Sequence, residues 1–235
     1  MDSKQALVLF SGGQDSATCL IWALKNFDQV ATIGYSYGQR HFVELECRLE
    51  FLSRFKDSFP DLAEHLLEDM VLNLGFISEL CRTALTHDES IVSRSSGFPN
   101  TFVPGRNVFF LSSAAAIAYQ KEINHLVGGM CETDFSGYPD CRRDTIDSLQ
   151  TTLNKAMETQ ITIHTPLMQL SKGDTWRLIE QWGGEKLVKL MVEFTHTCYE
   201  GTREQLHEWG YGCQQCPACE LRRKGYEQYR NGAAT

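Results

Sequence analysis

The chain has 235 residues, of which 42% are hydrophobic and 22% are charged. An apolar fraction of this size lets a chain bury enough surface to offset the entropy of folding, which excludes an intrinsically disordered protein. The 30 acidic and 22 basic residues leave a formal net charge of −8, which argues against a protein that binds mainly to a nucleic-acid backbone. The sequence contains neither a signal-peptide pattern nor a membrane-spanning run, so we expect a cytoplasmic protein without a nucleic-acid or membrane partner.

The N-terminal half alternates predicted strands with predicted helices. Short apolar runs predict strands at 5–10, 30–37 and 70–74, and longer apolar or amphipathic stretches predict helices at 16–26 and 41–57. The segment 83–104 is polar and contains Ser, Gly and Pro, so it predicts a long loop.

The C-terminal half continues the alternation and then changes character. Helices are predicted at 107–122, 143–159 and 172–182, and strands at 125–129 and 161–164. Alternating strands and helices predict an α/β fold with a doubly wound parallel sheet. From about Cys198 the chain is rich in Gly, Cys and Tyr, so we expect a main domain at 1–190 and a small C-terminal appendage at 191–235.

A glycine-containing hexapeptide, SGGQDS, stands where the first predicted strand gives way to the first helix (residues 11–16). Glycines let the backbone approach an anion, and the free N–H groups of a helix N-terminus bind phosphate oxygens. Ser11 and Ser16 add hydroxyl donors, and Asp15 is suited either to bind Mg²⁺ or to cap the helix. The hexapeptide lacks both the Walker A and the dinucleotide patterns. A tight turn with a polar cap is the alternative interpretation.

The hexapeptide resembles the pyrophosphate-binding loop of the N-type ATP pyrophosphatases. That resemblance implies that ATP binds here and that AMP is transferred to an oxygen of the substrate. We expect catalytic roles for Ser11, Asp15 and Ser16. Lys172, at the start of a predicted helix, is a further catalytic candidate that would reach the phosphates, unless it is an ordinary surface lysine. The implied nucleotide-binding segment comprises Phe10, Ser11, Gly12, Gly13, Gln14, Asp15, Ser16, Ala17, Thr18, Cys19 and Leu20.

Four cysteines near the C-terminus have the spacing of a metal site: Cys198, Cys213, Cys216 and Cys219. Four thiolates bind structural Zn²⁺ in a closed tetrahedral site, so we expect one structural zinc and no catalytic role for it. An iron–sulfur cluster also accepts four cysteines. Unrelated buried cysteines, or a redox pair, are the remaining alternatives.

Polar side chains also gather after the second and fourth predicted strands and at the start of the helix at 107–122. The carboxyl ends of parallel strands meet at one edge of a sheet, so we expect these groups to lie beside the glycine loop. Each segment taken alone favours a capped, solvated loop over a binding site. Together they supply arginines for anions, carboxylates for N–H groups and a ring for stacking. The candidate substrate-binding residues are Arg40, Arg106, Asp134, Tyr138, Asp140 and Arg142.

The order of six motifs resembles the 7-cyano-7-deazaguanine synthase family: SGGQDS, YGQRH, FVPGRN, CETDFSGYPDC, TPL followed by Lys172, and CxxCxxC. The resemblance runs from about Leu7 to Arg223. It implies ATP-dependent conversion of 7-carboxy-7-deazaguanine and ammonia to the 7-cyano base on the path to queuosine. It also implies a homodimer and a zinc bound by the four cysteines. One departure is the long stretch between Cys198 and Cys213, which makes Cys198 the least secure ligand, although loop length costs little free energy.

The chemistry implied is two rounds of AMP transfer at one site, first to the acid and then to the amide. The chain has no room for an ammonia-generating domain, so free ammonia is the expected nitrogen source. Two other functions stay open at this point. One is a tRNA-modifying thiolase of the same superfamily, and the other is a non-enzymatic zinc-ribbon binding module.

Overall fold

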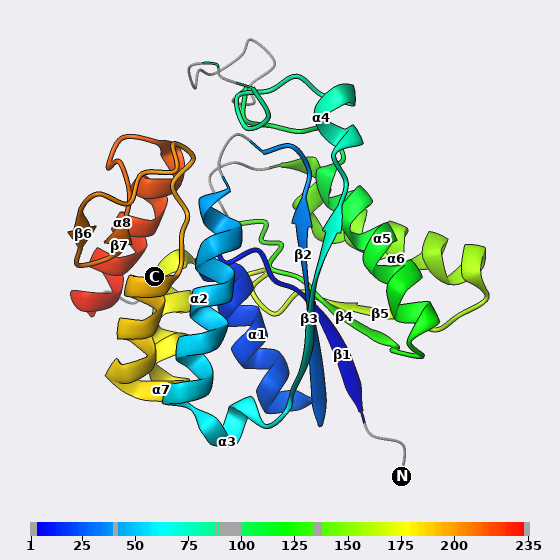
Figure 1. Cartoon of the computed structure of the whole chain (residues 1–235), viewed down its shortest axis with the longest axis horizontal. Coiled ribbons are helices and arrows are strands. Elements are labelled where there is room, and N and C mark those ends of the chain that lie inside the picture. The colour runs from blue at the N-terminus through cyan, green and yellow to red at the C-terminus, as the bar shows by residue number, and fades with distance from the viewer. Residues whose placement is uncertain (1–3, 40–41, 88, 90–99, 134–137, 233–235) are drawn as a thin grey trace.

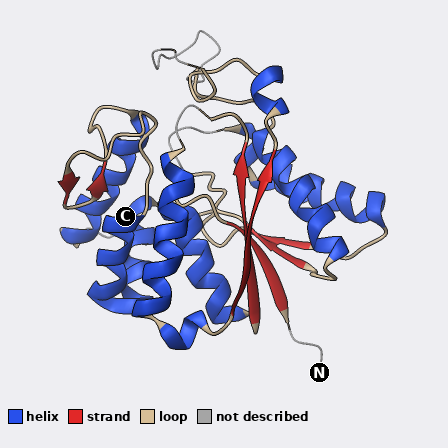
Figure 2. Ribbon diagram, viewed as in Figure 1, coloured by secondary structure: helices blue, strands red, loops and turns tan. Residues whose placement is uncertain are grey.

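The computed structural model describes residues 4–39, 42–87, 89, 100–133 and 138–232, and its centre is a five-stranded parallel sheet (Figures 1 and 2). The strands lie in the order β3-β2-β1-β4-β5, so the chain winds outward from β1 in both directions. This order confirms the predicted doubly wound α/β fold. The strands are β1 (Gln5–Leu9), β2 (Gln29–Ser36), β3 (Leu66–Asn73), β4 (His125–Val127) and β5 (Thr162–His164).

Helices cover both faces of the sheet (Figure 1). On one face α1 (Gln14–Asn26), α2 (Val43–Ser58) and α7 (Lys172–Phe194) share a core with Val8 and Phe10 of the β1 segment. On the other face α5 (Arg106–Gln120) and α6 (Arg143–Met157) share a core with Leu7 and Leu9. Successive residues of a strand point to opposite faces, so a run such as ALVLF is apolar throughout because both of its faces are buried.

The C-terminal segment packs against α7 as α8 (Pro217–Arg230) and a two-stranded ribbon, β6 (Leu206–His207) and β7 (Gly210–Tyr211). Arg222 is fully buried and donates to the carbonyls of Trp209, Thr195 and Met191, which ties the ribbon and the end of α7 to α8. Cys198 and Trp209 belong to the same buried cluster as β1. The predicted division at residue 190 falls inside α7 and stays a prediction.

Three elements differ from what the sequence predicts. The helix predicted at 172–182 continues to Phe194, passing through a non-helical residue at Gly184 (φ 64°), so the Gly183-Gly184 pair kinks it without ending it. Strand β3 begins at Leu66 rather than at residue 70, because its edge position leaves Glu68 and Asp69 exposed within the strand and interrupts the apolar pattern. The sequence pattern did not predict α8, whose buried face includes Arg222 and two tyrosines.

The remaining elements are short, and the other predicted boundaries differ from the observed ones by a few residues. The short helices are α3 (Pro60–Ala63), α4 (Phe76–Leu80) and a single 3-10 turn at Pro139–Cys141. Residues 83–87 and 100–104 belong to the predicted long loop, and most of the residues between them lie outside the described part of the chain. No helix in the described residues is both long enough and apolar enough to cross a membrane.

Candidate active site

The glycine loop joins β1 to α1 and is held by hydroxyl groups of its own. The N–H of Gly13 donates to Oγ of Ser11 (3.2 Å), which lies 3.1 Å from Oγ of Ser16, and Ser16 in turn donates to the carbonyl of Gly13 (3.0 Å). Gly13 is the N-cap of α1 and no side chain caps it. The first-turn N–H groups of α1 therefore keep their capacity to bind an anion, which the helix dipole favours.

Gly12 occupies a position that no other residue fits. Its φ is +93°, and a Cβ atom there would lie 2.6 Å from the carbonyl oxygen of Glu44 and 2.9 Å from the nitrogen of Arg48. The first turn of α2 therefore packs directly on the loop. From the other side, the N–H of His196 donates to the carbonyl of Gly12 (3.0 Å). The loop is thus fixed between α2 and the segment that follows α7.

Asp15 and Lys172 form an ion pair at the start of α1 and α7. Nζ of Lys172 lies 2.5 Å from Oδ2 of Asp15, and the side chains are 7% and 27% exposed. The interpretation of Lys172 as a surface lysine is therefore wrong. Oδ1 of Asp15 is buried and has no hydrogen-bond partner in the described residues, so it is available to a ligand.

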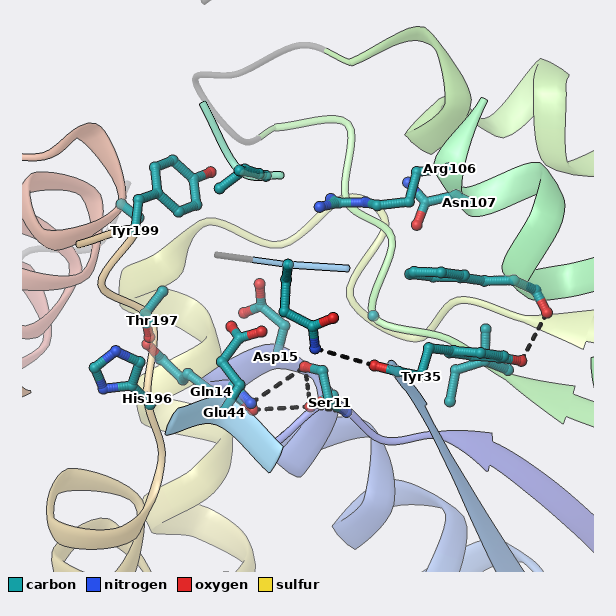
Figure 3. Close-up of a pocket in the computed structure, with 18 of the residues that line it drawn as sticks. Ser11, Gln14, Asp15, Tyr35, Glu44, Arg106, Asn107, His196, Thr197 and Tyr199 are labelled. Atoms are coloured by element: carbon teal, nitrogen blue, oxygen red, sulfur yellow. Dashed lines mark hydrogen bonds between the residues drawn. The ribbon is translucent and has the colours of Figure 1, made fainter. Parts of the chain in front are cut away.

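A cavity of about 430 Å³ opens beside this corner (Figure 3). Six residues of the predicted nucleotide segment line it: Phe10, Ser11, Gly13, Gln14, Asp15 and Ser16. The last four residues of that segment belong to the buried part of α1 that follows the loop. Ala17, Thr18, Cys19 and Leu20 are fully buried on α1.

Aromatic and amide side chains from the end of β2 and the start of α5 form the opposite wall. Tyr35 stacks on Phe110 with ring centroids 4.3 Å apart, and the amide of Gln39 bonds the backbone of Tyr37 and Tyr35. The guanidinium of Arg106 lies 5.8 Å from the ring centroid of Tyr37. The sequence analysis named only Arg106 among these as a candidate, although the motif YGQRH after a strand was a signal for Tyr37 and Gln39.

The other predicted substrate residues lie in different places. Tyr138 lines the cavity, with its hydroxyl 2.8 Å from Oγ1 of Thr101 and its ring stacked on Phe102. Asp140 accepts from the N–H of Asn107 (2.9 Å) in the first turn of α5 and is not among the lining residues. Arg142 is exposed at the N-cap of α6 and does not line the cavity either. Arg40 and Asp134 lie outside the described residues.

Two residues that line the cavity, Gln14 and Glu44, have polar side chains whose environment in the structure makes them candidates for ligand binding. Gln14 is 2% exposed, and neither atom of its side-chain amide has a hydrogen-bond partner among the residues that the structure describes. Glu44 reaches the cavity from the first turn of α2 (Figure 3). Loss of water around the carboxylate raises the pKa of Glu44 from 4.5 to about 7, against the opposing effect of Arg106.

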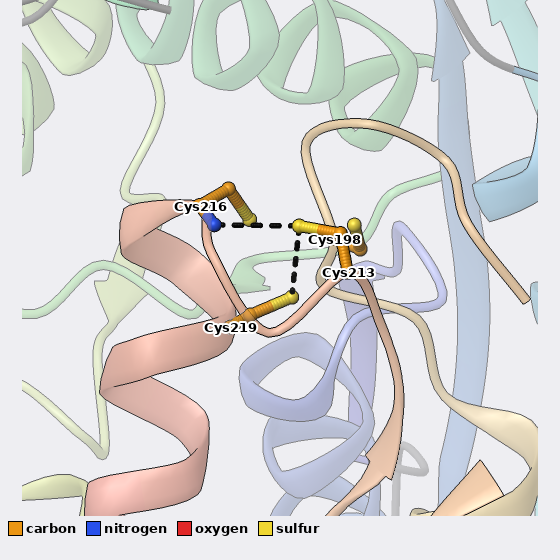
Figure 4. A group of neighbouring side chains, drawn as sticks. All are labelled: Cys198, Cys213, Cys216 and Cys219. Atoms are coloured by element: carbon orange, nitrogen blue, oxygen red, sulfur yellow. Dashed lines mark hydrogen bonds between the residues drawn. The ribbon is translucent and has the colours of Figure 1, made fainter. Parts of the chain in front are cut away.

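The four cysteines lie together (Figure 4). Their sulfur atoms are all within 4.8 Å of one another, and a tetrahedral zinc site with ordinary Zn–S bonds has sulfurs about 3.8 Å apart. The N–H of Cys216 donates to Sγ of Cys213 (3.3 Å), which favours a thiolate. The residues therefore fit a metal ion. Cys198 also lines the cavity, so the cysteine cluster forms part of its wall.

Known proteins share the sequence and the fold. Residues 5–230 match the family described as "Queuosine biosynthesis protein QueC". A 7-cyano-7-deazaguanine synthase of Paraburkholderia phytofirmans is 56% identical over 97% of this chain and 94% of its own length. A protein of Sphingopyxis alaskensis named 7-cyano-7-deazaguanine synthase 2 is 57% identical over 96% of each chain.

A solved structure with a related fold is a 4-thiouridine synthetase in complex with RNA and ATP. It is 13% identical, with a TM-score of 0.54, and covers 97% of this chain. This chain spans about half of that structure's length, so the likeness concerns the fold alone. The motifs, the family match and the close relatives agree: the chain belongs to the queuosine biosynthesis protein QueC family and is an enzyme.

Proposed function

We propose that the enzyme converts 7-carboxy-7-deazaguanine and ammonia to 7-cyano-7-deazaguanine with consumption of ATP. Membership of the family and the names of its close relatives support the product. The main observation that supports ATP as a substrate is the N-terminus of α1, which no side chain caps. Ser11 and Ser16 at this end of the helix line the cavity. Such a corner suits the outer phosphates of a nucleotide.

The residues of the loop have distinct proposed roles toward ATP. The backbone of Gly12 and Gly13 and the hydroxyls of Ser11 and Ser16 would bind the pyrophosphate part. The second oxygen of Asp15, buried and without a partner among the described residues, fits a Mg²⁺ ion. That ion would supply positive charge to the phosphates. Lys172, held against Asp15, would stabilise charge on the departing pyrophosphate.

The chemistry requires activation because a carboxylate is a poor electrophile toward ammonia. Transfer of AMP to the acid creates a good leaving group, and attack by ammonia then gives the amide. A second AMP transfer to the amide oxygen, followed by loss of AMP and a proton, gives the nitrile. In both rounds an oxygen of the substrate attacks the α-phosphorus of ATP, so the same binding site can serve both. The protein contributes the positioning of the reactants and the stabilisation of charge.

The aromatic wall is the proposed site of the base. Tyr138 offers a ring for stacking, and Arg106 offers a cation to the carboxylate of the substrate. Asp140 and Arg142 stay predicted contacts, as do Arg40 and Asp134.

The cysteine cluster fits a structural zinc, which would fix the segment that contacts Gly12. A homodimer in the cytoplasm, without a nucleic-acid partner, completes the proposal.

One incubation tests the product. The enzyme is mixed with the 7-carboxy base, ammonium, ATP and Mg²⁺, and the product is identified by mass. We expect the nitrile, and omission of ATP should abolish it. Recovery of the unchanged acid from the complete mixture would contradict the proposal.

A further inference from the structure

Glu44 lines the cavity with a carboxylate that has no hydrogen-bond or ion-pair partner in the described part of the chain. Among the described residues, the titratable groups that interact electrostatically with it are Arg106 from α5, Tyr37 from the end of β2 and Cys47 from its own helix. A carboxylate placed in a cavity with aromatic walls suits a cation or an N–H donor. A ligand of the reaction that enters the cavity can supply such a partner.

The position of Glu44 narrows the choice of ligand. Its backbone oxygen lies 2.6 Å from the place where a Cβ of Gly12 would be, so α2 brings Glu44 to the loop proposed for ATP. The reacting carboxyl group must lie at this end of the cavity to reach the α-phosphorus. In 7-carboxy-7-deazaguanine, the N–H groups of the six-membered ring are on the opposite side from that carboxyl, and the N–H of the five-membered ring points away from it. Of the ligands in the reaction, ammonium is the one that is a cation and must meet the reacting carbon.

We propose that Glu44 binds the ammonium ion and accepts the proton whose loss leaves ammonia as the nucleophile. This inference rests on the function proposed above. Proton transfer converts ammonium and the carboxylate to ammonia and the carboxylic acid. The nitrogen lone pair then forms the C–N bond with the acyl-adenylate, and the C–O bond to AMP breaks with its electron pair on the phosphate. One N–H proton of the newly attached nitrogen is transferred to the phosphate of the departing AMP. Glu44 releases to solvent the proton that it took from ammonium.

The titration of Glu44 matches this task. A pKa of about 7 leaves the carboxylate able to accept a proton at neutral pH and to release it again. Arg106, facing Glu44, favours the charged form and so limits the rise.

The test compares Glu44→Gln with Glu46→Gln, an exposed residue on the same turn of α2 that does not line the cavity. For Glu44→Gln we expect kcat/KM for ammonium to fall about 100-fold. Exchange of labelled pyrophosphate into ATP with the 7-carboxy base should persist, because adenylation precedes the nitrogen step. Glu46→Gln should match the wild type in both assays.

Hydroxylamine provides a matched nucleophile, because it is largely unprotonated at neutral pH whereas ammonia is largely protonated. Hydroxamate formation by Glu44→Gln should equal that of the wild type, which also shows that the variant is folded. With ammonium, the wild-type rate should level off above about pH 7, where Glu44 is ionised. The rate of Glu44→Gln should keep rising in proportion to free ammonia.

Each other outcome has a separate meaning. Loss of exchange and of hydroxamate in Glu44→Gln would assign the residue to binding of the base or ATP and overturn the proposal. An unchanged dependence on ammonium would overturn it as well. Absence of exchange and of nitrile in the wild type would instead refute the proposed function.

Discussion

The two walls of the cavity are built in different ways. The phosphate wall consists of consecutive residues of one loop, and its binding groups are backbone N–H groups and short hydroxyls. The opposite wall consists of side chains from β2, α5 and the segment before α6, held by stacking and by amide hydrogen bonds. A backbone site binds any phosphate of suitable size, whereas side chains select a particular base. Specificity is therefore expected to lie in the second wall.

The largest expected effect is on the phosphate wall. Asp15→Ala removes the partner of buried Lys172 and the proposed Mg²⁺ ligand, so turnover should fall about 1,000-fold or more. The rate of nitrile formation checks this, and thermal unfolding checks that the variant is folded. Asp147→Ala, which removes a more exposed carboxylate on α6, is the control. A rate near that of the wild type would remove Asp15 from the site.

A smaller effect is expected from the cysteine cluster. Cys216→Ser should lower the free energy of unfolding by several kcal/mol, because the metal would bind the folded chain better than the unfolded one. Cys198 lies two residues after His196, which bonds Gly12, so ATP binding should also weaken. Chelation of the metal should give the same result.

Urea unfolding and calorimetric titration with ATP measure the two effects of Cys216→Ser. Cys81→Ser, outside the cluster, should leave both measurements unchanged. A Cys216→Ser variant that retains full ATP affinity would show that the loop does not depend on the metal segment.

The smallest expected effect concerns the base wall. Arg106→Met keeps the length of the side chain but removes its charge, so KM for the 7-carboxy base should rise about tenfold, the equivalent of one charged hydrogen bond. The affinity for ATP should stay unchanged. Arg82→Met, which alters an exposed arginine paired with Glu89, is the control. A parallel loss of ATP affinity would show that the two walls do not act separately.

The sequence was most informative where function depends on neighbouring residues. SGGQDS between a strand and a helix, and three cysteines at intervals of three, predicted the loop and the cysteine cluster because the groups that act together are close in the chain. The parallel sheet followed from the alternation of apolar runs. In these regions local geometry determines the chemistry.

The base wall could be predicted only in part because tertiary packing builds it. Phe110 meets Tyr35 across 75 residues, and Glu44 reaches the cavity because α2 packs on Gly12. Asp140 shows a role that the sequence did not reveal. Its position after a strand predicts a contact with substrate, and the structure adds that its carboxylate accepts a hydrogen bond from the first turn of α5. No sequence pattern distinguishes a helix cap in such a loop from a ligand contact.

The most direct test of the central claim, that the corner before α1 holds the outer phosphates of ATP while AMP is transferred, is phosphorus NMR of the reaction. Spectra of the enzyme with the 7-carboxy base, ammonium, ATP and Mg²⁺ should show AMP and pyrophosphate accumulating together. Formation of ADP and inorganic phosphate in their place would contradict the account, even if the nitrile were made.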